Sequence, residues 1–214
     1  MSRFIIIEGG DGAGKSTLAT KLAIELERLG DSVLVVSDLV SSPKAKEVHS
    51  LVVKRAVGDN FTPNAELLLL YAGRWQHLYD TVIPALQKGQ TVISDRFEAT
   101  TFAYQVYARG ADLGLWQQLH QKTLAILEPF VTTAQYFHLQ ATNATTAKRR
   151  VEAGKTNDAF DGLSADFHQK TLAGYQAVVE QLDPAYAWQV IDAEQPADQV
   201  FTEVLSYWLK KTRL

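Results

Sequence analysis

The sequence predicts an α/β fold of three layers, in which helices cover both faces of a parallel β-sheet. Short runs of β-branched and other apolar residues alternate along the chain with longer segments that favour helix. The runs are continuous and lack the polar–apolar alternation of a half-exposed strand. Strands of this kind are typical of a parallel sheet that is buried on both faces. A glycine-rich sequence directly after the first run supports the same fold.

The first strand is expected at residues 4–7, and a helix at 18–29 follows the glycine-rich sequence. Gly30 and Asp31 break the helical pattern before a second strand at 32–36. This strand–helix–strand order is the connection that parallel strands require.

Two helices, at 44–57 and 62–87, are expected before the third strand at 90–94. Thr62 and Pro63 are a favourable helix start, because threonine caps the free N–H groups and proline suits the first helical position. The remaining elements are expected as helices at 98–107 and 113–127, a strand at 134–139, helices at 144–153 and 164–182, a strand at 188–191 and a helix at 197–210.

Composition sets the class of protein and excludes several functions. Hydrophobic residues make up 46% of the 214 residues, which is enough for one large core, and we expect a single domain over residues 1–214. A net charge of −3 gives no basic surface for nucleic acid, so no nucleic-acid partner is expected. The chain has no cysteine, which excludes thiol catalysis and disulfides. No apolar run approaches 18 residues and no leader-like segment opens the chain, so we expect no membrane association and a cytoplasmic location.

The glycine-rich sequence carries the strongest functional signal. Residues Gly9–Ser16 match the pattern G-x-x-x-x-G-K-[ST] at every position, between the expected strand and helix. Glycines let successive backbone N–H groups point inward around phosphate oxygens, and the following helix directs its positive end at them. A chance glycine-rich turn is the alternative, and the matching strand, helix and Lys–Ser pair speak against it. We expect a nucleoside triphosphate site formed by Gly9, Gly10, Asp11, Gly12, Ala13, Gly14, Lys15, Ser16 and Thr17.

Two residues of this motif have expected chemical roles. Lys15 is placed to reach the β- and γ-phosphates, and the Ser16 hydroxyl to ligate Mg²⁺. Asp95 follows the third strand, where an acid holds the same ion directly or through water. A surface turn aspartate is the alternative for Asp95. ATP and Mg²⁺ are therefore the expected cofactors.

Two arginines are candidates for contacts with an acceptor. Arg96 follows Asp95 into the same cleft, and its planar guanidinium suits a phosphate. Arg74 lies within an apolar helix, so it needs a buried partner. A nucleobase edge or a phosphate would serve, and an intramolecular ion pair is an equally good interpretation.

A basic segment beside a polar, glycine-bearing loop indicates a mobile lid at about 148–162. Such a lid brings cations onto phosphates and excludes water. Its candidate catalytic cations are Arg149 and Arg150, with Lys155 as a further candidate. A solvated basic helix face is the alternative. The five histidines show no metal-ligand spacing, and no role is assigned to them.

Together these motifs resemble the thymidylate kinase family over essentially the whole chain. Residues 4–17 resemble the family's P-loop, in which the acid at Asp11 faces the acceptor's sugar. Residues 68–74 are similar to the helix whose arginine binds thymine, and 95–97 to the family's Asp-Arg-Tyr motif. Residues 192–196 resemble the turn near adenine. The resemblance implies a five-stranded parallel sheet in a P-loop NTPase fold, Mg²⁺-ATP as donor, small nucleotide substrates and a homodimer.

The resemblance also assigns roles residue by residue. Arg96 bridges the donor and acceptor phosphates, and Tyr104 closes against the 2′ position and favours deoxyribose. The catalytic residues implied are Lys15, Arg96 and the lid cations Arg149 and Arg150. Those implied to contact the acceptor are Asp11, Leu70, Arg74, Arg96, Thr100, Thr101, Tyr104, Gln105 and Phe160.

The chain departs from the family pattern at three places. Ser37–Ser42 stands where the family shows Arg-Glu-Pro-Gly-Gly, so an arginine for the acceptor phosphate is missing. Leu70 stands where an aromatic ring stacks on thymine, a contact worth about 1–3 kcal/mol. Asp158–Asp161 lacks the lid arginine of the family's Asp-Arg-x-Glu motif. These departures leave three hypotheses: a dTMP kinase, a kinase of another nucleotide or a deoxynucleoside, or a nucleotide-binding paralogue with weak or no catalysis.

Overall fold

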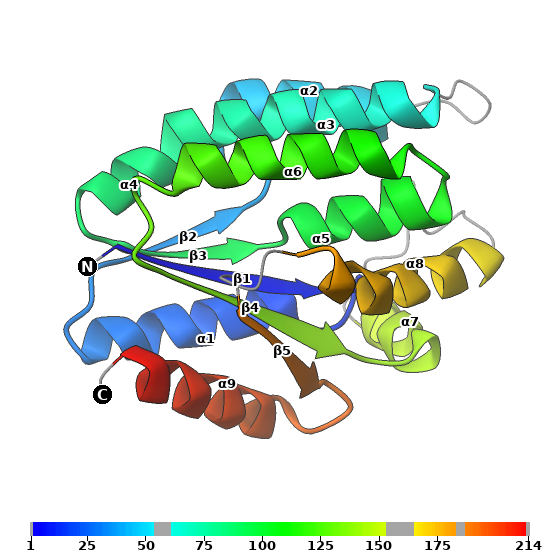
Figure 1. Cartoon of the computed structure of the whole chain (residues 1–214). Helices are drawn as coiled ribbons and strands as arrows, with labels where there is room; N and C mark the ends of the chain where they lie inside the picture. Colours follow the sequence, from blue (N-terminus) through cyan, green and yellow to red (C-terminus); the bar gives the residue numbers. More distant parts are fainter. Residues whose placement is uncertain (1, 54–60, 153–164, 183–186, 213–214) are drawn as a thin grey trace.

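A single sheet of five parallel strands forms the centre of the molecule, in the order β2-β3-β1-β4-β5. The computed structural model describes residues 2–53, 61–152, 165–182 and 187–212 (Figure 1). The fold expected from sequence is confirmed. The strands are β1 (Arg3–Gly9), β2 (Val33–Ser37), β3 (Thr91–Asp95), β4 (Thr133–Gln140) and β5 (Ala187–Asp192).

Helices lie on both faces of this sheet. α1 (Lys15–Arg28) and α9 (Ala197–Thr212) cover one face, and α3 (Pro63–His77), α4 (Ile83–Gln87) and α6 (Leu113–Leu127) lie over the other (Figure 1). β1 explains why both faces must be covered, since all its side chains from position 4 to 7 are fully buried. Ile5 and Ile7 pack in the same apolar cluster as Trp208, whereas Phe4 and Ile6 pack with Trp116.

The helix expected at 62–87 is one continuous run with a wide turn in it. Thr62 caps its start by accepting a hydrogen bond from the Ala65 N–H, as predicted. A π-helical segment, η1 (Leu78–Val82), joins α3 to α4. Pro84 follows that segment, and proline has no N–H for the regular helical bond. The widened turn lies where the helix must accommodate this proline.

The other helical segments lie in the connections that leave the carboxyl ends of β2, β3 and β4. The region expected to be one helix at 98–107 is α5 followed by a second π-helical segment, η2. These elements are α2 (Pro43–Val53), α5 (Glu98–Thr101), η2 (Phe102–Ala108), α7 (Asn143–Glu152), α8 (Ala165–Ala177) and the 3₁₀ turn η3 (Val178–Glu180).

The strand register brings four loops to one edge of the sheet. Ile7 of β1 lies beside Asp95 of β3, which in turn lies beside Ser37 of β2, and Gly9 lies beside Leu139 of β4. The arrowheads of β1 and β4 point toward α7 and α8 (Figure 1). A parallel sheet presents its ligand site at this edge. Within the described residues, no helix has both the length and the apolar character to cross a membrane.

Candidate active site

The loop between β1 and α1 depends on glycines. Gly9, Gly12 and Gly14 have φ values of 141°, 87° and 98°, in the region that side chains disfavour. A Cβ atom on Gly9 would lie 2.6 Å from the carbonyl oxygen of Leu139, so β1 packs against β4 too closely for any side chain there. No side chain caps the first turn of α1, which starts at Lys15 and leaves its N–H groups for an anion.

Lys15 is buried at the centre of this loop. It is 6% exposed, and its Nζ donates a hydrogen bond to the carbonyl oxygen of Gly10, 2.8 Å away. Burial lowers the pKa of the Lys15 ammonium to about 8, and the nearby charge of Arg96 acts in the same direction. A phosphate would supply the negative charge that this ammonium requires.

Ser16 and Asp95 form the pair expected for Mg²⁺. The Ser16 hydroxyl donates a hydrogen bond to Oδ2 of Asp95 over 2.6 Å. Both oxygens therefore reach one point beside the phosphate loop. Among the described residues, no group of three or more acidic, histidine or cysteine side chains is arranged to hold a metal ion. Two protein oxygens suit Mg²⁺, which takes its other ligands from phosphates and water.

Arg96 lies between the phosphate loop and a pocket that is also lined by Leu70 and Arg74. Its backbone has a φ of 73°, a conformation rare outside glycine, and its N–H donates to the carbonyl oxygen of Ile7 over 2.9 Å. Its guanidinium forms an ion pair with Asp11 and donates to the carbonyl oxygen of Gly9 over 3.1 Å. Arg96 holds the pKa of Asp11 well below its usual value. Backbone strain of this kind is stored at functional sites, and here it directs the guanidinium across the site.

Two buried residues that the sequence analysis did not single out hold this arrangement. Glu8 is fully buried and accepts hydrogen bonds from the Phe97 N–H over 2.9 Å and the Thr100 hydroxyl over 2.6 Å. Burial raises the pKa of this carboxyl. Tyr175 of α8 is also fully buried, and its hydroxyl lies 3.1 Å from the carbonyl oxygen of Gly9 and 3.0 Å from Nη1 of Arg96. Glu8 and Tyr175 thus link β1, α5 and α8.

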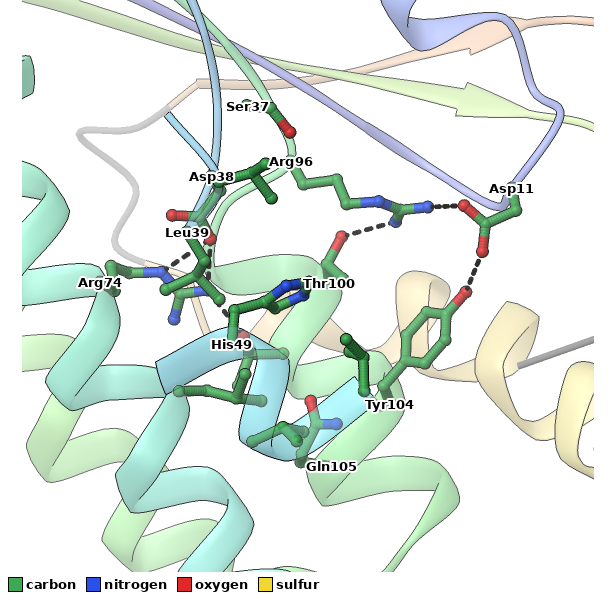
Figure 2. A pocket seen from close by; sticks show the side chains of 15 residues that line it. Asp11, Ser37, Asp38, Leu39, His49, Arg74, Arg96, Thr100, Tyr104 and Gln105 are labelled. Atoms are coloured by element: carbon green, nitrogen blue, oxygen red, sulfur yellow. Dashed lines mark hydrogen bonds and ion pairs between the residues drawn. The ribbon is translucent and has the colours of Figure 1, made fainter. Parts of the chain in front are cut away.

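A pocket of about 200 Å³ opens beside Arg96, between α2, α3, α5 and η2 (Figure 2). Eight of the residues predicted to contact the acceptor line it together: Asp11, Leu70, Arg74, Arg96, Thr100, Thr101, Tyr104 and Gln105. Phe160 lies outside the described residues. Seven further residues, not predicted to contact the acceptor, also line this pocket: Ser37, Asp38, Leu39, Val40, His49, Val52 and Val53.

The pocket ends at a buried ion pair between Arg74 and Asp38. Arg74 is 1% exposed and donates to Oδ2 of Asp38 from Nε and Nη2, over 3.0 and 2.6 Å. It also donates to the Thr101 hydroxyl over 2.8 Å. The intramolecular ion pair left open by the sequence is therefore present. Nη1 of Arg74 has no hydrogen-bond partner among the described residues, so a nucleobase contact by Arg74 stays a prediction.

The predicted lid cations are only partly described. Arg149 of α7 lines a second pocket with Gly14, Thr17 and Lys21, on the outer side of the phosphate loop. Arg150 belongs to the same helix, but its side chain lies outside the described part of the chain, as does the whole of Lys155. Their catalytic roles stay predictions.

Comparison with known proteins agrees with this geometry. The family model described as thymidylate kinase matches residues 7–204. A thymidylate kinase from Syntrophotalea carbinolica is 34% identical over 201 residues, which cover 94% of this chain and 92% of the relative. One from Acinetobacter baumannii is 34% identical and covers 95% and 98%, and one from Desulfovibrio desulfuricans is 32% identical and covers 95% and 93%.

The chain belongs to the thymidylate kinase family. The family resemblance found in the sequence is thereby confirmed. Two of the departures from the family pattern lie at the same site, because the Ser37–Ser42 segment and Leu70 both contribute to the pocket beside Arg96.

The residues that sequence reasoning missed are those whose role depends on the folded chain. An acid at the end of a buried strand, as at Glu8, is a signal that could have been used. Tyr175 is 79 residues from Arg96 and looks like any apolar residue of an amphipathic helix. His49 gave no metal-ligand spacing, and its position on the pocket wall comes from the packing of α2.

Proposed function

We propose that this protein is a nucleoside monophosphate kinase that transfers the γ-phosphoryl group of ATP to dTMP and yields dTDP and ADP. The observation that carries the proposal is the position of Arg96, between a complete phosphate loop and a pocket lined by the residues expected to contact the acceptor. The relatives that are named thymidylate kinases support the choice of dTMP.

In the proposed reaction, binding aligns the two phosphates and the protein stabilises the charge between them. The loop N–H groups and Lys15 hold the donor phosphates, and Arg96 reaches from Asp11 toward the acceptor phosphate. Ser16 and Asp95 would hold Mg²⁺, which neutralises the developing phosphate charge when bound. A nucleotide phosphate is already an anion near neutral pH, so the acceptor needs no general base. Arg149 and Arg150 are the proposed lid cations.

The test is product analysis with Mg²⁺-ATP and a panel of acceptors: dTMP, other nucleoside monophosphates and unphosphorylated thymidine. We expect dTDP from dTMP, at a higher kcat/KM than for any other acceptor. Higher turnover of another acceptor would replace dTMP in the proposal. ATP binding with no transfer to any acceptor would instead support a nucleotide-binding paralogue without catalysis.

We further propose a homodimer in the cytoplasm. Large apolar side chains are exposed on α3, η1 and η2, including Leu68 (47%), Tyr79 (59%) and Tyr107 (46%). Exposed apolar surface of this kind favours association with another protein surface. Light scattering after size-exclusion chromatography should give twice the 23.7 kDa mass of the chain, and fractionation of cells should recover the protein without membranes.

A further inference from the structure

The pocket beside Arg96 is called the acceptor pocket below, because it is proposed to bind the acceptor nucleotide. One of its walls is aliphatic where the family resemblance places an aromatic ring. Leu70 of α3 is 5% exposed and packs in a small cluster with Leu39 and Val52. A leucine contacts a flat nucleobase but has no π face to stack on it. A ring from another element would have to supply this contact.

His49 brings a ring to this wall from α2. It follows Ala45 by one helical turn and precedes Val52 and Val53, which also line the pocket. Its imidazole is directed into the pocket (Figure 2). Among the described residues that line the pocket, His49 and Tyr104 are the two with rings. The Tyr104 hydroxyl lies 3.3 Å from Asp11, at the Arg96 end of the pocket, which leaves His49 as the ring of the wall that Leu70 shares.

Tight packing of α2 on α3 fixes where His49 lies. A Cβ atom on Gly73 would lie 3.2 Å from Cδ2 of Leu39 and 3.5 Å from the carbonyl oxygen of Ala45, so α2 and the loop before it pack directly against α3 at this glycine. At the start of α2, the buried Ser42 hydroxyl donates to Oδ2 of Asp80 over 2.8 Å. The ring of His49 therefore stands on a fixed helix and not on a loop.

We propose that the imidazole of His49 packs on the nucleobase of the acceptor and supplies the aromatic contact that Leu70 does not. His49 is then a specificity-determining residue of this chain, a conclusion that rests on the proposed function because it requires a nucleotide acceptor. Arg74 and Gln105, which also line the pocket, are left to read the edge of the base.

The experiment compares the Kd and KM for dTMP in the variants His49→Ala, His49→Phe and His49→Asn. Glu47→Ala, an exposed position of the same helix, is the matched control. Loss of one stacking ring weakens base binding between about 5-fold and 150-fold, and we expect His49→Ala to fall in this range. His49→Phe should stay near the wild type, whereas His49→Asn should resemble His49→Ala. The Kd for ATP, the melting temperature and kcat at saturating dTMP should change little.

A second variant restores the ring on the other helix. Leu70→Phe should recover most of the dTMP affinity in the His49→Ala background. A dTMP affinity of His49→Ala equal to that of the wild type would overturn the proposal. The proposal would also fail if His49→Asn bound dTMP as tightly as the wild type while His49→Phe bound it weakly. If the wild type binds another nucleotide in preference to dTMP, the function proposed above fails, and the same variants measured with that nucleotide still decide the role of His49. Absence of nucleotide binding by the wild type would overturn both.

Discussion

The phosphate loop and the acceptor pocket lie on either side of Arg96, and they are built in different ways. The phosphate loop is one continuous segment, Gly9–Ser16, whose backbone forms the binding surface. The acceptor pocket takes side chains from the end of β2, from α2, α3, α5 and η2, and from the loop itself (Figure 2). The first retains every residue of its motif, and the second departs from the family pattern at Ser37–Ser42 and Leu70.

This difference indicates which part of a kinase tolerates change. A backbone cradle needs glycine where φ is positive and strands pack closely, so a substitution such as Gly9→Ala has no compensating partner. A pocket made of side chains from several helices can lose a ring on one helix and gain a ring on the next. The pair Leu70 and His49 is our example.

The largest expected effect is on stability, at the buried ion pair of the acceptor pocket. Asp38→Ala leaves Arg74 buried and without its carboxylate, and we expect a loss of about 3–5 kcal/mol in the free energy of unfolding, measured in urea. The double variant Asp38→Leu with Arg74→Met should recover most of this loss, because no unpaired charge remains. A double variant as unstable as Asp38→Ala would show that shape, and not charge, holds this end of the pocket together.

The next largest effect is expected on kcat, from a substitution in the phosphate loop that holds the donor phosphates. Lys15→Ala removes the ammonium inside the phosphate loop, and we expect kcat to fall by about 10²–10³-fold. Lys46→Ala, an exposed position on α2, is the control and should leave kcat unchanged. Both variants should melt near the wild-type temperature. Turnover by Lys15→Ala at the wild-type rate would remove the phosphate loop from the proposed mechanism.

A smaller effect is expected on the Mg²⁺ requirement, from a substitution at Asp95, which with Ser16 is proposed to hold the ion. Asp95→Asn keeps the size of the side chain and removes the charge beside Ser16, so the concentration of Mg²⁺ needed for half-maximal activity should rise by about 10–100-fold. Activity is measured across a magnesium titration at fixed ATP, with Asp31→Asn on the far side of the molecule as control. An unchanged midpoint would place the metal elsewhere.

The smallest effect is a pH dependence of ATP binding. The pKa of Lys15 in the free protein is about 8 because the ammonium is buried, and bound phosphate should raise it. ATP binding should therefore take up a proton at pH 8.5, and affinity should fall as pH rises through 8 and above. Calorimetry in two buffers of different ionisation enthalpy measures this uptake. The Lys15→Ala variant should lack it, and equal uptake in that variant would assign the proton to another group.

The sequence predicted what depends on neighbouring residues and missed what depends on distant ones. The phosphate loop, the Thr62–Pro63 helix start and the helix 113–127 are local patterns, and the structure shows each where it was expected. The Asp38–Arg74 pair joins residues 36 positions apart, so the sequence left the partner of Arg74 open. His49 and Tyr175 reach the site only through helix packing, which no local pattern encodes.

The activity of Arg96→Ala tests the proposed mechanism most directly, since this guanidinium is the proposed link between the phosphate loop and the acceptor pocket. ATP and dTMP binding are measured by calorimetry, and dTDP formation by product analysis, on the same preparation. We predict that each nucleotide still binds while kcat falls by about 10²–10³-fold. A kcat close to that of the wild type would contradict it, because the two halves would then be coupled through another residue.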